Sequence, residues 1–185
     1  MGMLNVVDRE GRIIGKDTRE NIHKEGLLHR EVHVWFYTPK GEIIFQLRGK
    51  DKDTFPNLLD ATVGGHVELN SDFVDTALKE MLEETGVKAE EKDLRLITTL
   101  RKRTKDAATG KVNNVIRAIY AYEFQDPLES LKVEGREAQK FEAWLIEDLL
   151  RGLDDADKKR FIASMLEKDY LDIYKKIGRN AEEIV

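Results

Sequence analysis

The segment from residue 64 to residue 87, GGHVELNSDFVDTALKEMLEETGV, constrains the fold of this chain more than any other stretch. Two glycines interrupt an apolar run over residues 60–67, which indicates a short strand followed by a loop. Apolar residues then recur at helical spacing, at Val74, Ala77, Leu78, Met81 and Leu82. Gly86 ends this pattern and is typical of a left-handed helix cap. The segment therefore predicts a strand, a loop and a helix over residues 71–85.

Three glutamates, Glu80, Glu83 and Glu84, crowd the last turns of the predicted helix. Residues three and four apart lie one turn above each other, so each like-charge pair costs about 0.2–0.5 kcal/mol. Carboxylates near a helix C-terminus also oppose the helix dipole, by roughly 0.3–1 kcal/mol each. These penalties invert when a hard divalent cation such as Mg²⁺ binds among the carboxylates. A metal site and a solvated acidic face are the two interpretations of this cluster.

The rest of the chain alternates between predicted strands and predicted helices. Strand signals occur at MLNVVD near the N-terminus, in a hairpin over residues 31–48, and over residues 93–103, 113–124 and 141–146. Short helices are expected over residues 17–26, with Thr18 as N-cap and Gly26 as stop, and over residues 147–152. This order indicates a mixed β-sheet with interleaved helices, an α/β layered domain.

The last part of the chain carries a further apolar stripe. Its members recur at helical spacing, at Phe161, Ile162, Met165, Leu166, Tyr170, Ile173, Tyr174 and Ile177. We expect a terminal amphipathic helix within residues 151–185 that packs on the domain or forms the interface of a homodimer.

Composition and charge exclude several classes of protein. The chain has 185 residues, a size for one domain, and no cysteine, which excludes disulfides and a cysteine nucleophile. No apolar run approaches the roughly 18 residues that a membrane span needs. The net charge of −5 disfavours wrapping a nucleic-acid polymer, while small anionic ligands stay compatible with local basic clusters. We expect a cytoplasmic protein with a small-molecule partner and no membrane or nucleic-acid polymer.

The glutamate segment resembles the signature of the Nudix hydrolases, G-x5-E-x7-R-E-U-x-E-E-x-G-U, where U is aliphatic. The positions that match are Gly65, Glu80, Met81, Glu83, Glu84, Gly86 and Val87. Two positions differ, because Ser71 stands in place of glutamate and Lys79 in place of arginine. Stretches such as VVDREGRIIGKDTRE and KGEIIFQLR are similar to the branch that includes isopentenyl-diphosphate isomerase and its hydrolase-like relatives. The resemblance covers residues 4 to about 150, and it gives a Nudix domain over residues 1–150.

The resemblance implies a Nudix fold, a mixed sheet between helices, and a pyrophosphohydrolase that cleaves a nucleoside diphosphate linked to another moiety. It implies Mg²⁺ as cofactor, with Mn²⁺ as a substitute. The metal site that it implies comprises Glu80, Glu83, Glu84 and Gly65, with Glu80 as a third ligand or as the base. The catalytic set is Glu80, Glu83, Lys79 and Glu137, and Glu134 is the next choice after Glu137 for a base in a distant loop.

The two departures from the signature have different consequences. At position 71 a serine hydroxyl can cap the helix, and Asp72 and Asp75 supply negative charge to its first turn, so the helix should form. Asp72 is one residue out of register with the missing carboxylate. Lys79 keeps the charge of the arginine that orients the acidic cluster but loses its planar fork. The alternative function is therefore a catalytically weak Nudix-like ligand-binding domain.

Basic residues on either side of the signature are candidates for holding phosphate groups. Arg48 and Lys50 precede it, and Arg101 follows it. His66, inside the signature, is a further substrate-binding candidate.

Isomerase activity is a third, less favoured hypothesis. His23, His29 and His66 lie close to positions where the isomerase carries metal-binding histidines. Gly64, however, replaces the catalytic cysteine of the isomerase, and Asn113 and Val115 replace its acidic metal ligands.

Overall fold

The computed structural model of the chain describes residues 2–52, 54–106, 109–135 and 138–182. Its centre is a seven-stranded mixed sheet in the order β5-β4-β3-β8-β7, in which β6 also pairs with β3 and β9 with β4. These strands are β3 (His29–Tyr37), β4 (Glu42–Arg48), β5 (Leu59–Asp60), β6 (Val63–His66), β7 (Arg95–Lys105), β8 (Val112–Glu123) and β9 (Ala138–Leu145). The pairing of β3 with β8 is parallel and the other pairings are antiparallel. The strands predicted from sequence are present, and 60–67 is split between β5 and β6.

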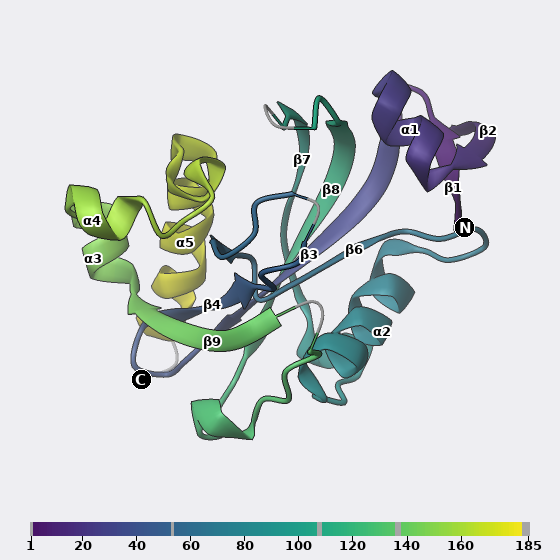
Figure 1. Cartoon of the computed structure of the whole chain (residues 1–185). Coiled ribbons are helices and arrows are strands. Elements are labelled where there is room, and N and C mark those ends of the chain that lie inside the picture. The colour runs from purple at the N-terminus through teal and green to yellow at the C-terminus, as the bar shows by residue number, and fades with distance from the viewer. Residues whose placement is uncertain (1, 53, 107–108, 136–137, 183–185) are drawn as a thin grey trace.

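Helices cover both faces of the sheet (Figure 1). Helix α2 (Phe73–Thr85) packs on the face formed by the even-numbered residues of β3, such as Val34 and Phe36. Helix α5 (Lys168–Glu182) packs on the opposite face, where Trp35 is fully buried. Successive side chains of a strand point to opposite faces, so β3 contributes to two separate apolar cores. This mixed sheet between helices is the architecture predicted from sequence.

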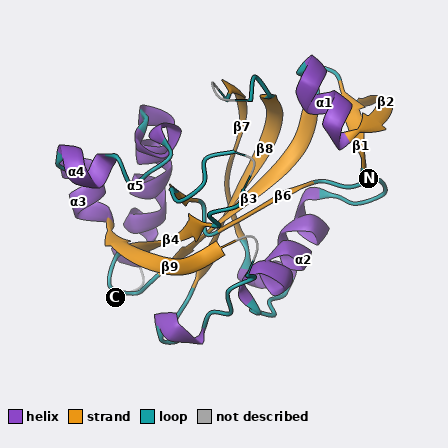
Figure 2. Ribbon diagram, in the orientation of Figure 1, coloured by secondary structure: helices purple, strands orange, loops and turns teal. Residues whose placement is uncertain are grey.

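A smaller unit stands at one end of the sheet and consists of a two-stranded hairpin and a short helix (Figure 2). The hairpin pairs β1 (Met3–Val7) with β2 (Ile13–Thr18), and helix α1 (Arg19–Glu25) follows directly. Thr18 caps α1 by accepting a hydrogen bond from the Asn21 backbone N–H at 3.2 Å, and Gly26 ends the helix at a φ of 65°. Both caps were predicted. Strand β2 was missed because its residues, IIGKDT, are exposed and include glycine and aspartate, which disfavour strands.

Helix α2 begins two residues later than predicted, and a different side chain caps it. Asp72, not Ser71, is the N-cap, and its Oδ1 accepts a hydrogen bond from the Asp75 backbone N–H at 2.8 Å. Asp72 has the extended backbone that an N-cap needs, with a φ of −107°, so it takes the capping position for which Ser71 was a candidate. Gly86 adopts a φ of 73° and donates its N–H to the Leu82 carbonyl, as the left-handed cap requires.

The C-terminal region consists of two short pieces followed by one longer helix, and not of a single helix. After α3 (Ile146–Arg151) come α4 (Asp155–Lys158), a 3-10 turn (Ala163–Leu166) and α5. Between α4 and the turn the chain pairs with β5, because Leu59 donates its N–H to the Arg160 carbonyl and accepts from the Ile162 N–H. Helical spacing therefore continues in the sequence while the backbone is extended at residues 160–162.

The whole apolar stripe of the C-terminal region nevertheless reaches the core on the α5 face. Its aromatic members pack edge to face, with the Trp35 and Tyr174 rings 5.1 Å apart. Across the described ranges of the chain, no helix has the length and apolar character that a membrane crossing needs.

Candidate functional site

The three glutamates of α2 differ in their surroundings. Glu84 is 6% exposed, and its Oε2 accepts a hydrogen bond from Gln46 Nε2 of β4 at 2.9 Å. Glu80 is half-buried, and Glu83 is exposed to solvent. Since a hydrogen bond from a neighbouring side chain orients a ligating carboxylate, Gln46 is a partner of the cluster that the sequence did not indicate.

Gly65 and Glu80 lie in direct contact. A Cβ atom built on Gly65 would lie 2.7 Å from Glu80 Oε1, and nearer still to the side-chain carbons, which is closer than real Cβ contacts. The glycine is thus required by the close approach of Glu80 to strand β6 and not by an unusual backbone angle. Two positions of the signature that are 15 residues apart meet in this way.

The surroundings of the Glu80 carboxyl group disfavour its charged form. Burial raises its pKa to about 7, and the negative charges of Glu83, Glu68 and Glu134 add to this effect. The ammonium group of Lys79 acts in the opposite direction. A carboxyl group with a pKa near neutrality is suited to general acid–base chemistry.

Lys79 forms an ion pair with Glu68, with 3.2 Å between Nζ and Oε2. Glu68 lies in the loop between β6 and α2, where a β-bridge to Leu4 ties it to the N-terminal hairpin. A carboxylate three residues before Ser71 is thereby placed beside the lysine that replaces the signature arginine. Asp72, which is one residue out of register with the missing carboxylate, is engaged as the helix cap.

The model of the NUDIX domain family matches residues 27–165 of the chain. The chain belongs to the NUDIX domain family. An uncharacterized Nudix hydrolase of Clostridium acetobutylicum is 29% identical over 156 residues, which cover 82% of this chain and 74% of the relative. Other curated relatives align over 84 residues, so this chain spans less than half of their length.

Two solved structures show the same fold. A crystal structure of DR0079 from Deinococcus radiodurans has a TM-score of 0.67 at 16% identity and covers 94% of this chain and 98% of its own. The NUDIX domain of Shewanella oneidensis NrtR, solved in complex with ADP ribose, has a TM-score of 0.57 at 13% identity and covers 89% and 99%. The structural similarity to these two proteins shows the Nudix fold.

The predicted distant base, Glu137, lies outside the described residues. Glu134, the next choice, precedes it in the segment between β8 and β9 and is exposed. Its charge helps to raise the pKa of Glu80, so this segment runs close to the Nudix helix.

The predicted phosphate-binding cations are dispersed. Arg48 directs its guanidinium inward, with 3.0 Å between Nη1 and Asp60 Oδ2 and further hydrogen bonds to the Thr54 carbonyl. Lys50 is exposed in the loop after β4, and Arg101 is exposed on the edge strand β7. Arg48 therefore holds the loop before β5, while Lys50 and Arg101 are open to solvent.

His66 points away from the Nudix glutamates. In strand β6 the side-chain direction alternates, so Gly65 faces Glu80 on the α2 side and His66 faces the other side. There its Nε2 lies 3.2 Å from His23 Nε2, and its ring stacks on that of His29 at a centroid distance of 5.2 Å. Burial lowers the pKa of His66 to about 3 and also lowers the pKa of His29.

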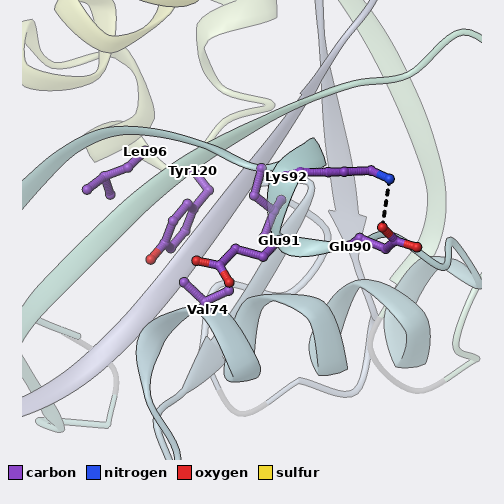
Figure 3. A pocket seen from close by; sticks show the side chains of 7 residues that line it. Val74, Glu90, Glu91, Lys92, Leu96 and Tyr120 are labelled. Carbon is purple, nitrogen blue, oxygen red and sulfur yellow. Dashed lines mark ion pairs between the residues drawn. The ribbon is translucent and has the colours of Figure 1, made fainter.

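A shallow hollow of about 760 Å³ lies on the α2 side of the Nudix sheet, between the start of α2 and strands β7 and β8 (Figure 3). It is lined by Val74, Glu90, Glu91, Lys92, Leu94, Leu96 and Tyr120. None of these residues belongs to the signature positions or to the cations predicted to bind phosphate. The hollow is therefore separate from the glutamate cluster.

Proposed function

We propose that this chain is a Mg²⁺-dependent Nudix pyrophosphohydrolase that cleaves a nucleoside diphosphate linked to another moiety. The single observation that carries the proposal is the contact between Gly65 and Glu80, which presents a carboxyl group with a pKa near neutrality beside Glu83 and Glu84. Membership in the Nudix family supports the reaction class.

The donors on α2 fit a hard cation. Mg²⁺ takes one or two protein carboxylates and keeps water or phosphate oxygens in its other positions. Glu84, oriented by Gln46, and the exposed Glu83 would supply these carboxylates. When bound there, the cation would neutralise charge on the diphosphate and lower the pKa of a bound water.

Glu80 is the residue of the cluster best suited to accept a proton. In the proposed reaction, a water oxygen bonds to one phosphorus, the bond from that phosphorus to the bridging oxygen breaks, and the water proton passes to the Glu80 carboxylate. The leaving phosphate carries away the electron pair. Lys79, held by Glu68, offsets the negative charge that surrounds Glu80.

One structural relative and two exposed cations of this chain support the proposed substrate class. The NUDIX domain of NrtR binds ADP ribose, a nucleoside diphosphate linked to a sugar. In this chain, Lys50 and Arg101 are exposed cations that are suited to phosphate groups. Mn²⁺ is proposed as a substitute for Mg²⁺ because it also prefers oxygen ligands.

Ligand binding without efficient turnover is the second candidate function. Ser71 favours it, because the carboxylate of the signature is absent at that position. Glu68 favours the enzyme, because it places a carboxylate beside Lys79, the lysine that replaces the arginine of the signature.

The test is hydrolysis of a panel of nucleoside diphosphates, nucleoside triphosphates, ADP-ribose and dinucleoside polyphosphates with Mg²⁺, with products identified by mass spectrometry. Glu83→Gln should lower turnover by roughly 100-fold or more while the fold is kept. Glu147→Gln is the matched control, since Glu147 is also exposed on a helix and its ion pair with Arg151 lies at the surface. It should leave turnover unchanged.

The outcomes separate the two candidate functions. Turnover that Glu83→Gln abolishes supports the hydrolase. Retained binding of ADP-ribose by calorimetry, with no cleavage of any compound, supports the binding domain and contradicts the hydrolase. Turnover that is insensitive to Glu83→Gln contradicts the assignment of the site.

A further inference from the structure

A small basic hollow lies where helix α5 meets the start of β7, the last strand in the order of the sheet. Its volume is about 300 Å³, and it is lined by Arg95, Leu96, Ile97, Lys176 and Arg179. Residues three apart on a helix lie one turn above each other, so Lys176 and Arg179 share one side of α5. Two elements that are far apart in the sequence thus bring three cationic side chains to one concave surface, which we call the basic hollow.

The side chain of Arg95 is held by an aromatic ring. Its guanidinium lies 5.9 Å from the centroid of the Tyr37 ring, and contact with a ring face leaves the N–H groups able to bind other partners. The Nη2 atom is shielded from solvent and has no hydrogen-bond partner among the described residues. A buried donor without an acceptor is unfavourable, so an acceptor oxygen in the basic hollow would stabilise this arrangement.

The positive charge of the basic hollow is not balanced within the described ranges, where none of its three cations forms an ion pair. Asp172, one turn before Lys176, is paired with Lys168. Glu123 accepts a hydrogen bond from the Tyr37 hydroxyl at 3.4 Å. The helix dipole favours cations near the C-terminal end of α5, but it does not account for the cation that β7 contributes. An anion from outside the chain would balance all three.

The donors of the basic hollow suit a phosphate group. The planar fork of a guanidinium matches two phosphate oxygens, and an ammonium group adds a compact charge from another direction. A phosphate group presents three or four oxygens that can accept from several directions, whereas a carboxylate presents two oxygens in one plane. Since ligand pockets range from about 300 to 1,000 Å³, a hollow at the lower end fits a phosphate with no more than a small substituent.

We propose that Arg95, Lys176 and Arg179 bind the phosphate group of a small anion, at a site separate from the Nudix carboxylates. Helices α5 and α2 pack on opposite faces of the sheet, so the two sites lie on different sides of the molecule (Figure 1). A bound phosphate would join the edge strand β7 to α5 and stabilise their contact. Phosphate binding at this place does not depend on hydrolase activity.

The first experiment measures binding of inorganic phosphate to the full chain by calorimetry, with EDTA present so that no metal ion recruits phosphate to the Nudix carboxylates. One phosphate per chain should bind. Arg95→Gln and Lys176→Gln should each weaken binding by about 10–100-fold, the factor expected for a hydrogen bond between charged partners. Lys175→Gln is the matched control, since Lys175 is exposed on the same helix but does not line the basic hollow. It should leave the affinity nearly unchanged.

The second experiment uses the unaltered protein and so does not depend on the folding of a variant. In ¹H–¹⁵N spectra of the arginine side chains, phosphate should shift the Nε signals of Arg95 and Arg179 and leave those of Arg48 and Arg117, which are engaged in ion pairs, in place. Glycerol phosphate in place of inorganic phosphate distinguishes a phosphomonoester ligand from the free ion.

Succinate is the control ligand, because it carries two negative charges without a phosphate group and should bind more weakly. Equal affinity for succinate and phosphate would overturn the assignment of the ligand. Equal losses of affinity in Lys175→Gln and Lys176→Gln would show a general charge effect and contradict a built site. Unchanged Arg95 signals at saturating phosphate would contradict it as well.

Discussion

The two faces of strand β6 carry opposite kinds of polar cluster. On the α2 face, Gly65 meets Glu80, and the carboxylates are negative and partly exposed. On the other face, His66 meets His23 and His29, and the rings are close enough for one ion to join their ligand atoms. Adjacent residues of one short strand thus contribute to two clusters with different side-chain chemistry.

The two clusters differ in how their donor atoms are held. The carboxylates of α2 are not among the described groups whose ligand atoms lie within 4.8 Å of one another, so water and substrate oxygens would have to complete the proposed metal site. On the other face, backbone carbonyls orient the rings of His23 and His29. The donors of the proposed hydrolase site therefore depend more on the substrate than the histidine rings depend on any group outside the chain.

The largest effect is expected beneath the histidine face, at the buried ion pair of Glu31 and Arg117. Their side chains are 10% and 8% exposed, and Arg117 also contacts the Tyr170 hydroxyl of α5. Arg117→Met should lower the free energy of unfolding by about 3–5 kcal/mol, because it leaves the Glu31 carboxylate buried without its partner. Urea unfolding measures this change.

The control is the double substitution Glu31→Leu with Arg117→Met. It should recover much of the stability, because no buried charge is then left unpaired. A cost of less than about 1 kcal/mol for Arg117→Met alone would mean that the pair behaves like a surface ion pair.

The next effect concerns pH and the buried His33. Burial lowers its pKa to about 4, and the nearby Arg117 adds to this, while Glu31 and Asp60 act in the opposite direction. In the unfolded chain the ring takes up a proton below about pH 6.5, whereas in the folded chain it does so only near pH 4. The free energy of unfolding therefore decreases as the pH is lowered from 6.5 to 4.

At about 1.4 kcal/mol per pKa unit, His33 contributes roughly 3 kcal/mol to the loss of stability between pH 7 and pH 4. Denaturant unfolding at the two pH values should show a correspondingly smaller loss in His33→Gln. Equal losses in the variant and in the wild type would show that His33 does not titrate between the folded and unfolded states.

The next effect concerns Gly64 and Gly65, which face opposite sides of β6, so that a methyl group added at either position disturbs one side only. In Gly65→Ala the new Cβ would overlap the Glu80 side chain, while in Gly64→Ala it would lie 3.3 Å from His33 Cδ2, a tight but adjustable contact. Displacing a catalytic group by about 1 Å costs on the order of 100-fold in rate. Gly65→Ala should therefore lose roughly 100-fold in turnover.

Gly64→Ala is the matched variant of this pair. It should keep most of the turnover, since its methyl group points to His33, on the face opposite Glu80. Similar rate losses in the two variants, measured with the same substrate, would remove the functional distinction between the faces.

The smallest effect is expected at the exposed ion pair of the carboxylate face. Lys79 and Glu68 have side chains that are 44% and 59% exposed, so a double-mutant cycle with alanine should give a coupling of at most about 1 kcal/mol in stability. Lys79→Arg should keep the pair. A coupling as large as that of Glu31 and Arg117 would contradict the contrast between an exposed and a buried pair.

Much of the fold was predictable from local signals. The caps of α1, the β3–β4 strands and the α2 helix depend on residues close in sequence, and each was identified. Strand β2 and the break before α5 were missed because they depend on pairing with distant segments, as when Leu59 holds residues 160–162 in an extended path.

The candidate site was predictable to a different extent. The motif named Glu80, Glu83, Glu84 and Gly65 as candidates, and the structure adds the contact that joins Gly65 to Glu80. Gln46 and Glu68 were missed, because their roles depend on strand β4 and on the loop path after β6. The resemblance to the isomerase had already grouped His23, His29 and His66, and the structure adds the antiparallel pairing of β3 with β6 that brings their rings together.

Anomalous X-ray scattering from crystals soaked with Mn²⁺ tests the proposed metal site most directly. The account predicts a Mn²⁺ peak beside Glu83 and Glu84, on the α2 face of β6. A strong Mn²⁺ peak elsewhere, with none at these glutamates, would contradict it.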